Sequence, residues 1–361
     1  MGARLRQWAA VLLLGIAPLA LVEGGLRLFG WPTERVRTLG KLLNFDADSW
    51  NGAIGVFRPG ARSTVMWPPE LAYEVHINGL GLRGPEIAPT PPAGRQRILA
   101  LGDSMTFGYY LEEDETWPAQ LEARLRATGQ DVEVVNGGSG GWSIESHAKF
   151  LEERALSLAP DHVVIGFCAN DIADLSRGGA VFEGQKRAVG GGRGALTEAV
   201  YTSATYELYL RAKVWWKHFR ESRSGELDHA LTSVDVPPDQ RDALWERYAE
   251  WLDRLHATLT EAGIPLTLVY IPDAYKLEND LPATDAERLR QLARDRGIGF
   301  ASPLARFEAN PDAKLFHLPL DPHLAVDGAA LVASAVEQAL ADADDMPAPL
   351  PPEGVDGEDA S

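Results

Sequence analysis

The chain has 361 residues, of which 45% are hydrophobic and 24% charged, so it can bury the core of one large globular domain or two small ones. Its formal net charge of −18 argues against a nucleic-acid backbone as partner, because phosphates repel an acidic protein. The single cysteine, Cys168, excludes an intrachain disulfide and a cysteine-rich metal site.

The first 31 residues have the pattern of a membrane anchor or a secretory signal. Arg4 and Arg6 precede an uncharged run from Trp8 to Val22. As a helix this run would span about 22 Å, short of a hydrocarbon core of about 30 Å unless apolar residues up to Trp31 extend it. No small-x-small cleavage site follows the run, which favours an uncleaved anchor over a cleaved signal. The basic start predicts a cytoplasmic N-terminus, with the bulk of the chain outside the cytoplasm.

Residues 32–96 are rich in proline and glycine and show no helical period, so we predict an extended lead-in rather than a second domain. This lead-in contains a short β-like piece at 73–77, followed by a glycine-rich turn segment at 78–86. A solvent-exposed side chain is the simplest interpretation of Arg83 within that segment.

From residue 97 the pattern alternates between apolar runs typical of buried strands and amphipathic runs typical of helices. This alternation predicts an α/β domain over residues 97–343, with a parallel sheet covered by helices on both faces. The expected strands are 97–101, 132–136, 162–167, 266–271 and 299–301. The expected helices are 116–127, 143–158, 238–262, 285–296 and 328–341.

Two segments fall outside this alternation. An interruption at about 176–235 contains a glycine-rich piece and an aromatic helix around residues 206–219. An aromatic stripe of this kind is typical of a core, or of a contact to a membrane or partner, and a substrate lid is the alternative. The tail, residues 344–361, is rich in proline and acidic residues, and we predict that it is disordered.

Four polar segments follow predicted strands or precede the last predicted helix, which is where an open α/β sheet binds its ligands. The first is Gly-Asp-Ser at 102–104, and the second is the glycine loop, residues 137–141, whose backbone amides can approach a ligand closely. Asn170 follows the third strand with a carboxamide donor. Asp321 lies two residues before His323, just ahead of the last helix.

These segments together contain the parts of a serine hydrolase. A serine hydroxyl is a poor nucleophile at neutral pH unless a base takes its proton. His323 can act as that base for Ser104, with Asp321 holding the imidazole tautomer. The chain has no histidine pair at metal-ligand spacing and no phosphate-binding glycine loop, so we expect neither a metal nor a cofactor.

The order of these motifs and the residues within them resemble those of the SGNH, or GDSL-type, hydrolase superfamily of esterases and lipases. The resemblance covers residues 97–341, and it takes in the N-terminal anchor of bacterial membrane-attached members. It implies a three-layer α/β/α sandwich, flavodoxin-like, with five parallel strands in the order 2-1-3-4-5. It also implies a nucleophile at Ser104, an acid and a base at Asp321 and His323, and an oxyanion hole formed by Ser104, Gly141 and Asn170.

The resemblance implies a serine esterase of the bacterial inner membrane that hydrolyses an acyl or acetyl ester of a small molecule, lipid or glycan. A single-pass anchor would place its catalytic domain outside the cytoplasm, and a secreted or periplasmic enzyme is the alternative. Two other functions stay open, an O-acyltransferase acting on a glycan and a catalytically silent binding protein on the same fold. Many members carry Asp-x-x-His where this chain has one residue fewer, and Ala325 stands where Asn is commoner. The resemblance therefore does not identify the substrate of this chain.

Other residues in the same segments could take the catalytic roles. Ser139 also fits the Gly-x-Ser-x-Gly nucleophile elbow of α/β-hydrolases. That assignment would leave residues 102–104 and Asn170 without a role, so Ser104 is the preferred nucleophile. His317 and His147 are alternative bases if the segment around His323 lies elsewhere.

Overall fold

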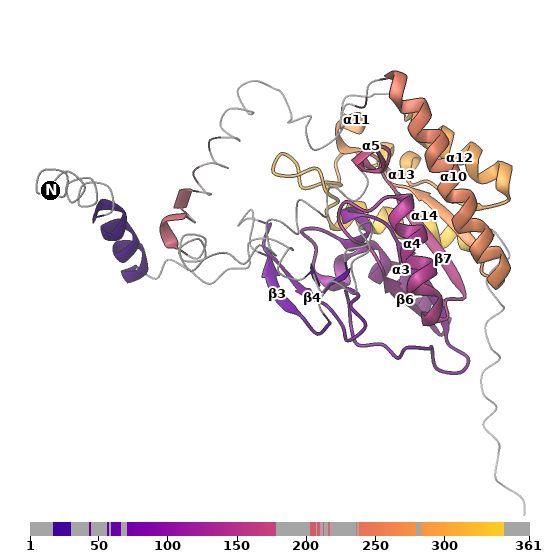
Figure 1. Ribbon diagram of the computed structural model, residues 1–361, viewed down its shortest axis with the longest axis horizontal. Helices are drawn as coiled ribbons and strands as arrows, with labels where there is room; N and C mark the ends of the chain where they lie inside the picture. Colours follow the sequence, from indigo (N-terminus) through magenta and orange to yellow (C-terminus); the bar gives the residue numbers. More distant parts are fainter. Residues whose placement is uncertain are drawn as a thin grey trace, which may run out of the picture.

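A five-stranded parallel sheet with helices on both faces forms the centre of the molecule (Figure 1). This computed structural model describes residues 17–29, 43–44, 56–57, 59–65, 71–177, 238–278 and 283–342, with scattered positions between 203 and 236. The strands are β5 (Gln96–Leu101), β6 (Val132–Asn136), β7 (His162–Phe167), β8 (Leu266–Tyr270) and β9 (Gly299–Ala301). Their order is β6-β5-β7-β8-β9, which is 2-1-3-4-5 when the strands of this sheet are counted along the chain. The predicted α/β fold class is confirmed.

Successive side chains of a strand point to opposite faces of the sheet. Both faces are apolar, because both sets of side chains are hydrophobic. In β5, Leu99 and Leu101 pack into the core on one face, whereas Ile98 and Ala100 pack into the core on the other. None of these four side chains is more than 1% exposed. A strand buried on both sides gives the continuous apolar run that predicted it.

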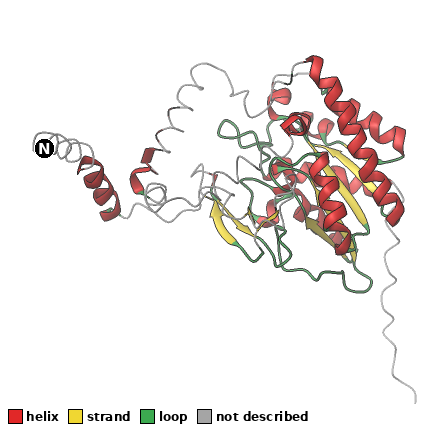
Figure 2. Ribbon diagram, in the orientation of Figure 1, coloured by secondary structure: helices red, strands yellow, loops and turns green. Residues whose placement is uncertain are grey.

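The helices divide between the two faces, which makes three layers (Figure 2). One face is covered by α3 (Trp117–Ala127), α13 (Leu304–Glu308) and α14 (Val326–Asp342). The other face is covered by α4 (Ile144–Glu153), α5 (Asn170–Arg177), α10 (Pro238–Ala262) and α12 (Thr284–Arg296). Three shorter helices are α2 (Ser104–Phe107), η4 (Glu113–Glu115) and α11 (Ala274–Glu278).

The helix predicted at 143–158 is divided in two. The backbone of Arg154 leaves the helical region with a φ of −140°, so α4 ends there and η5 (Ala155–Leu158) follows as a separate turn. The short helices α2, α5, α11 and α13 were not predicted, because fewer than three turns carry too little periodicity to stand out from the sequence.

The lead-in is folded against the domain. Its described strands form two antiparallel pairs, β1 (Leu43–Asn44) with β2 (Val56–Phe57) and β3 (Arg62–Val65) with β4 (Tyr73–His76). An antiparallel bridge between Arg83 and Asn136 then attaches the lead-in to the outer edge of β6. The predicted lead-in at 32–96 therefore contains short antiparallel strand pairs and contacts the end of β6 through this bridge.

Arg83 is 2% exposed, so its predicted exposure to solvent is wrong. Its guanidinium donates hydrogen bonds to the backbone oxygens of Phe107 at 2.7 Å, Gly108 at 2.6 Å and Leu111 at 2.5 Å. It also lies 5.5 Å from the ring centroid of Tyr73. Burial lowers the pKa of Arg83 to about 10, which leaves the side chain charged at neutral pH. Local sequence could not signal this, because the acceptors are carbonyl groups of another segment.

Three sequence predictions fall largely or wholly outside the described residues: the anchor run, the interruption at 176–235 and the tail at 344–361. Residues 17–28 form a helix. Among the helices of the described ranges, none is long and apolar enough to cross a membrane. The Glu23 carboxylate accepts hydrogen bonds from the N–H groups of Ala204 at 3.0 Å and Thr205 at 2.8 Å, which joins this helix to the interruption.

A second buried arginine, Arg97, joins the lead-in to two strands of the sheet. Its Nε donates to Glu133 of β6 at 2.8 Å, and both side chains lie in the interior. Its Nη1 donates to the Leu158 carbonyl at 2.6 Å, and its Nη2 donates to the Ala88 carbonyl of the lead-in at 2.7 Å. One guanidinium therefore satisfies groups from three segments.

We expect Arg97→Ala to lower the free energy of unfolding by about 3–5 kcal/mol, because it leaves the Glu133 carboxylate buried without its cation. The matched control is Arg95→Ala, since Arg95 also pairs with an acid, Asp131, at 2.8 Å but at the surface. A surface pair of this kind contributes at most about 1 kcal/mol. Urea denaturation at pH 7 measures both variants, and equal losses would contradict this account.

Candidate active site

Ser104, His323 and Asp321 form a continuous hydrogen-bonded chain at the carboxyl end of β5. Ser104 is the first residue of α2, three positions after the last residue of the strand. His323 Nε2 lies 2.7 Å from Ser104 Oγ, and His323 Nδ1 lies 2.5 Å from Asp321 Oδ1. The same carboxylate oxygen accepts the backbone N–H of His323 at 3.0 Å. The structure thus brings together the serine, histidine and aspartate predicted from sequence, although 219 positions separate the first two.

The carboxylate of Asp321 makes His323 a stronger base. Burial alone would lower the pKa of His323, but the negative charge of Asp321 and its hydrogen bond outweigh burial and raise that pKa above the ordinary value of 6.5. Burial alone would likewise raise the pKa of Asp321, and the charge and hydrogen bonds of His323 lower it below its usual range. At neutral pH Asp321 is therefore ionised, and it fixes the proton of the neutral imidazole on Nδ1.

Two consecutive tyrosines flank His323. The ring of Tyr109 stacks on the imidazole with a centroid distance of 5.1 Å and an interplanar angle of 23°. The ring of Tyr110 meets the imidazole edge-on at 5.5 Å. Burial and the negative charge of Asp321 raise the pKa of the Tyr110 hydroxyl. Sequence reasoning missed both tyrosines, because their contacts with His323 join segments that lie far apart in the chain.

The predicted glycine loop packs against the segment that follows Ser104, at distances that exclude side chains. A Cβ atom on Gly138 would lie 2.3 Å from the backbone nitrogen of Phe107. A Cβ atom on Gly140 would lie 2.1 Å from the hydroxyl oxygen of Tyr109. Gly141 has a φ of +77°, in the left-handed region that favours glycine. The loop that contains Gly141 therefore lies directly against the nucleophile segment.

Asn170 begins α5 and lies between two carboxylates. Its Nδ2 donates to Asp103 Oδ2 and to Asp174 Oδ2, both at 2.9 Å. Because Asp103 directly precedes Ser104, the first of these bonds ties the end of β7 to the end of β5. The carboxamide is held beside the serine, and both of its hydrogens are engaged in the free protein.

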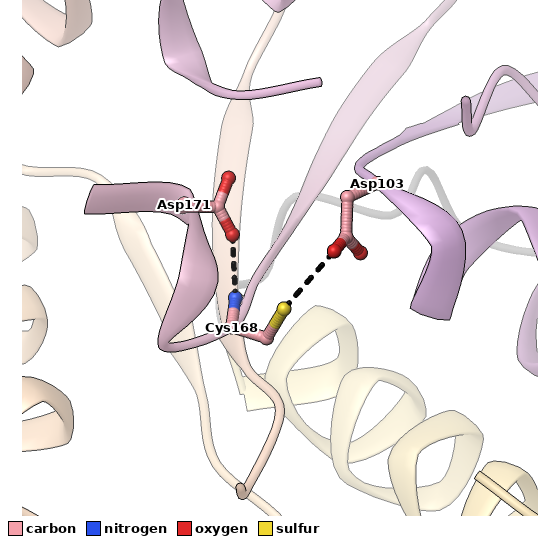
Figure 3. A group of neighbouring side chains, drawn as sticks. All are labelled: Asp103, Cys168 and Asp171. Carbon is pink, nitrogen blue, oxygen red and sulfur yellow. Dashed lines mark hydrogen bonds between the residues drawn. The ribbon is translucent and has the colours of Figure 1, made fainter. Parts of the chain in front are cut away.

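Asp103, Cys168 and Asp171 form a buried cluster next to this asparagine (Figure 3). The Cys168 thiol donates to Asp103 at 3.1 Å, and the Cys168 N–H donates to Asp171 at 2.8 Å. Their ligand atoms lie within 4.8 Å of one another, a spacing that suits a metal ion, although none was expected from sequence. Burial, together with the charge of Asp103, raises the pKa of the thiol and of Asp171 well above their ordinary values. The thiol is therefore neutral at pH 7, whereas a metal ligand has to be a thiolate, and this favours a hydrogen-bonded cluster over a metal site.

The alternative site residues lie in other surroundings. Ser139 is 2% exposed, and its N–H donates to the Gly102 carbonyl at 3.0 Å. His147 is buried beside Trp142, and burial lowers its pKa to about 4. His317 lies against the ring of Tyr110 at 5.9 Å, and burial lowers its pKa to about 4 as well. The imidazole that contacts the Ser104 hydroxyl is that of His323.

We expect the Cys168 thiol to be unreactive in the native protein, because it is buried and its pKa is raised, and the thiolate is the reactive form. A chromogenic disulfide reagent at pH 8 should titrate no thiol in the folded chain and one thiol after addition of guanidinium chloride. Cys168→Ala is the blank in both conditions. Rapid labelling of the folded wild-type chain would contradict the hydrogen-bonded cluster described above.

One family model, one relative and several solved structures are similar to this chain. The model of the GDSL-like lipase/acylhydrolase family matches residues 100–331. An arylesterase of Vibrio mimicus is 36% identical over 76 residues, which is 21% of this chain and 38% of that relative. Among solved structures, TesA is 15% identical with a TM-score of 0.42, over 69% of this chain and 99% of that one. The lipase/acylhydrolase of Enterococcus faecalis is 16% identical with a TM-score of 0.42, over 68% of this chain and 95% of that one.

Proposed function

The chain belongs to the GDSL-like lipase/acylhydrolase family, and on that premise we propose that it is a serine esterase that hydrolyses a carboxylic ester. The hydrogen-bonded chain from Ser104 through His323 to Asp321 carries the proposal, because it is the arrangement that activates a serine hydroxyl. The arylesterase relative supports an acyl or acetyl ester with a good leaving group as the first substrate to try. All three residues lie within residues 97–343, outside the anchor segment expected at residues 1–31.

The proposed reaction passes through an acyl-enzyme. His323 Nε2 accepts the proton of Ser104 as its Oγ attacks the carbonyl carbon of the ester, and the oxygen of that carbonyl becomes negatively charged. The imidazolium, held by Asp321, then donates the proton to the leaving alkoxide. Water attacks the acyl-serine with His323 again as base, which releases the carboxylic acid and restores the hydroxyl.

Three donors are proposed for the oxyanion: the backbone amides of Ser104 and Gly141 and the side chain of Asn170. The first two belong to segments that pack against each other at the carboxyl ends of neighbouring strands. Because both amide hydrogens of Asn170 are engaged by carboxylates, donation by this residue requires the exchange of one of those bonds for the oxyanion. One such donor contributes roughly 3–4 kcal/mol to transition-state stabilisation in related chemistry.

We expect Ser104→Ala to lower kcat for p-nitrophenyl acetate by more than about 10⁴-fold, the scale on which members of a triad act. Ser139→Ala is the matched control and should retain turnover, since it removes the same atom from the alternative nucleophile. Full activity in Ser104→Ala, or loss in Ser139→Ala alone, would overturn the assignment.

Repeating the assay with a glycan present tests acyl transfer, which would yield acetylated glycan in place of acetate.

The raised pKa of His323 predicts the pH dependence of the reaction. Only the neutral imidazole can accept the serine proton, so kcat/KM should rise with pH through a single acidic limb whose midpoint lies above 6.5. Asp321 stays ionised throughout this range because its pKa is lowered. Initial rates between pH 5 and 9, corrected with Ser104→Ala at each pH, measure the profile. A midpoint clearly below 6.5 would mean that the carboxylate does not support the imidazole.

A further inference from the structure

Tyr109 contacts three segments of the candidate site. Its N–H donates to the Ser104 carbonyl at 3.1 Å, which fixes its backbone to the nucleophile segment. Its ring stacks on the imidazole of His323 with a centroid distance of 5.1 Å and an interplanar angle of 23°. Its hydroxyl lies against the α-carbon of Gly140 in the glycine loop. One side chain therefore lies between the base and the loop that is proposed to bind the oxyanion.

The contact with the glycine loop depends on the missing side chain of Gly140. The φ of Gly140 is not in the left-handed region, so its backbone conformation does not call for glycine. A Cβ atom at this position would nevertheless overlap the Tyr109 hydroxyl and would lie 2.8 Å from Cζ of the same ring. Gly140 therefore leaves the space that the tyrosine fills, whereas the next residue, Gly141, supplies a left-handed backbone.

The lead-in helps to hold the ring of Tyr109 in place. The ring packs against a cluster of buried residues to which β2 and β4 contribute Phe57, Tyr73 and Val75. It meets the ring of Phe107 at 5.6 Å with an interplanar angle of 87°, and Phe107 lies 5.0 Å from Phe57. The position of the tyrosine is therefore set by the lead-in as well as by the nucleophile segment.

The stacking of the two rings favours the protonated form of His323. The face of a tyrosine ring carries partial negative charge and attracts a cation within about 6 Å of its centroid. His323 becomes such a cation when it accepts the proton of Ser104. Stacking on Tyr109 therefore stabilises the imidazolium more than it stabilises the neutral imidazole.

We propose that Tyr109 is a positioning residue that holds the imidazole of His323 between Ser104 and the glycine loop and stabilises the imidazolium formed during the reaction. The inference rests on the proposed esterase function and adds the side chain that sets the base relative to the oxyanion loop. Tyr109 acts through its contacts with His323 and Gly140 and takes no part in proton transfer. The lead-in acquires a role as well, because its strands support this ring.

The direct test compares Tyr109→Phe, which keeps the ring, with Tyr109→Leu, which removes the aromatic face. We expect kcat for p-nitrophenyl acetate to fall about tenfold in Tyr109→Leu and at most about threefold in Tyr109→Phe. KM should stay within twofold of wild type, because the contact strengthens only when the imidazole is charged. Without the ring the imidazolium is less stable, so the acidic limb of kcat/KM should move to lower pH by up to about one unit in Tyr109→Leu. Wild-type kcat with an unmoved limb in Tyr109→Leu would overturn the proposal.

A matched control separates the stacking contact from general loosening of the structure. Tyr248→Leu makes the same change in the core of α10, where Tyr248 is 1% exposed. It should lower the melting temperature and leave the acidic limb in place, and an equal movement of the limb in this variant would refute the role of the stack. Both variants keep the other titratable or charged groups around His323, which are Asp321, His317, Asp103 and Tyr110.

A ring of unchanged shape keeps the test informative if Tyr109→Leu does not fold. Pentafluorophenylalanine, introduced at position 109 by suppression of an amber codon, keeps the ring and reverses the charge of its face. Compared with Tyr109→Phe, it should lower kcat and move the acidic limb to lower pH. Identical profiles for these two variants would show that the face of the ring has no electrostatic effect on His323, against the proposal.

A double-mutant cycle tests the contact with the glycine loop. Gly140→Ala places a methyl group where the Tyr109 hydroxyl lies, and we expect kcat to fall at least tenfold because the ring has to move. Tyr109→Phe removes the atom nearest to that methyl group, so Gly140→Ala should cost less in this background. Strictly additive losses would mean that Gly140 and Tyr109 act independently, and the positioning of the loop would then be wrong.

The titration of His323 provides a readout that does not depend on turnover. Its Cε1 proton can be followed by ¹H NMR and assigned by its absence in His323→Asn. The midpoint should move to lower pH in Tyr109→Leu or in the pentafluorophenylalanine variant and stay in place in Tyr248→Leu. If the wild-type chain shows no Ser104-dependent hydrolysis, the proposed function fails while this titration still tests the stack. An unmoved midpoint in a folded Tyr109 variant would refute the inference whatever the substrate.

Discussion

Parallel pairing of β5 with both β6 and β7 is the constraint on which the site depends. The register places Ala100 opposite Asn136 of β6 and opposite Val164 of β7, so the three strands end at one edge of the sheet. A slip of one residue would turn every side chain of a strand to the other face. Because both faces are packed, such a slip would disrupt two cores at once. The segments after these strands, which contain Ser104, the glycine loop and Asn170, are therefore delivered to the same edge.

Asp103 connects these strand ends into one unit. Its Oδ1 accepts the N–H of Met105 at 2.9 Å and begins α2, while its Oδ2 accepts hydrogen bonds from Asn170 and Cys168. A carboxylate that is 1% exposed requires such donors, since an unpaired buried charge costs several kcal/mol. The same charge contributes to the raised pKa of His323. One buried acid thus caps the nucleophile helix, orients the asparagine and influences the base.

The lead-in holds the turn that contacts His323, through the side chain of Arg83. A planar guanidinium with five donors can satisfy several carbonyl groups of a turn at once, which a lysine cannot do. Arg83 donates to three carbonyl groups at the end of α2 and in the turn that follows it. This turn places the rings of Tyr109 and Tyr110 against His323. The conformation of the turn is therefore maintained from outside the α/β core. Segments of this kind are easily mistaken for linkers, because their own periodicity is weak.

The sequence by itself determined the strands, their order in the chain and the polar segments at their ends. The predicted limits of β6 and β7 match the structure at both ends, since strands buried on two faces leave unbroken apolar runs bounded by polar residues. Ser104, Asp321 and His323 were preferred because of their side-chain chemistry, their place next to predicted strands and helices and the family resemblance, with Ser139, His147 and His317 as alternatives. Tertiary structure decided which hydroxyl meets which imidazole, and it decided the surroundings of Arg83 and Tyr110. The partners of those two residues are carbonyl groups and imidazole rings from distant segments, and a local pattern of apolar and polar residues does not record contacts that form only when the chain folds.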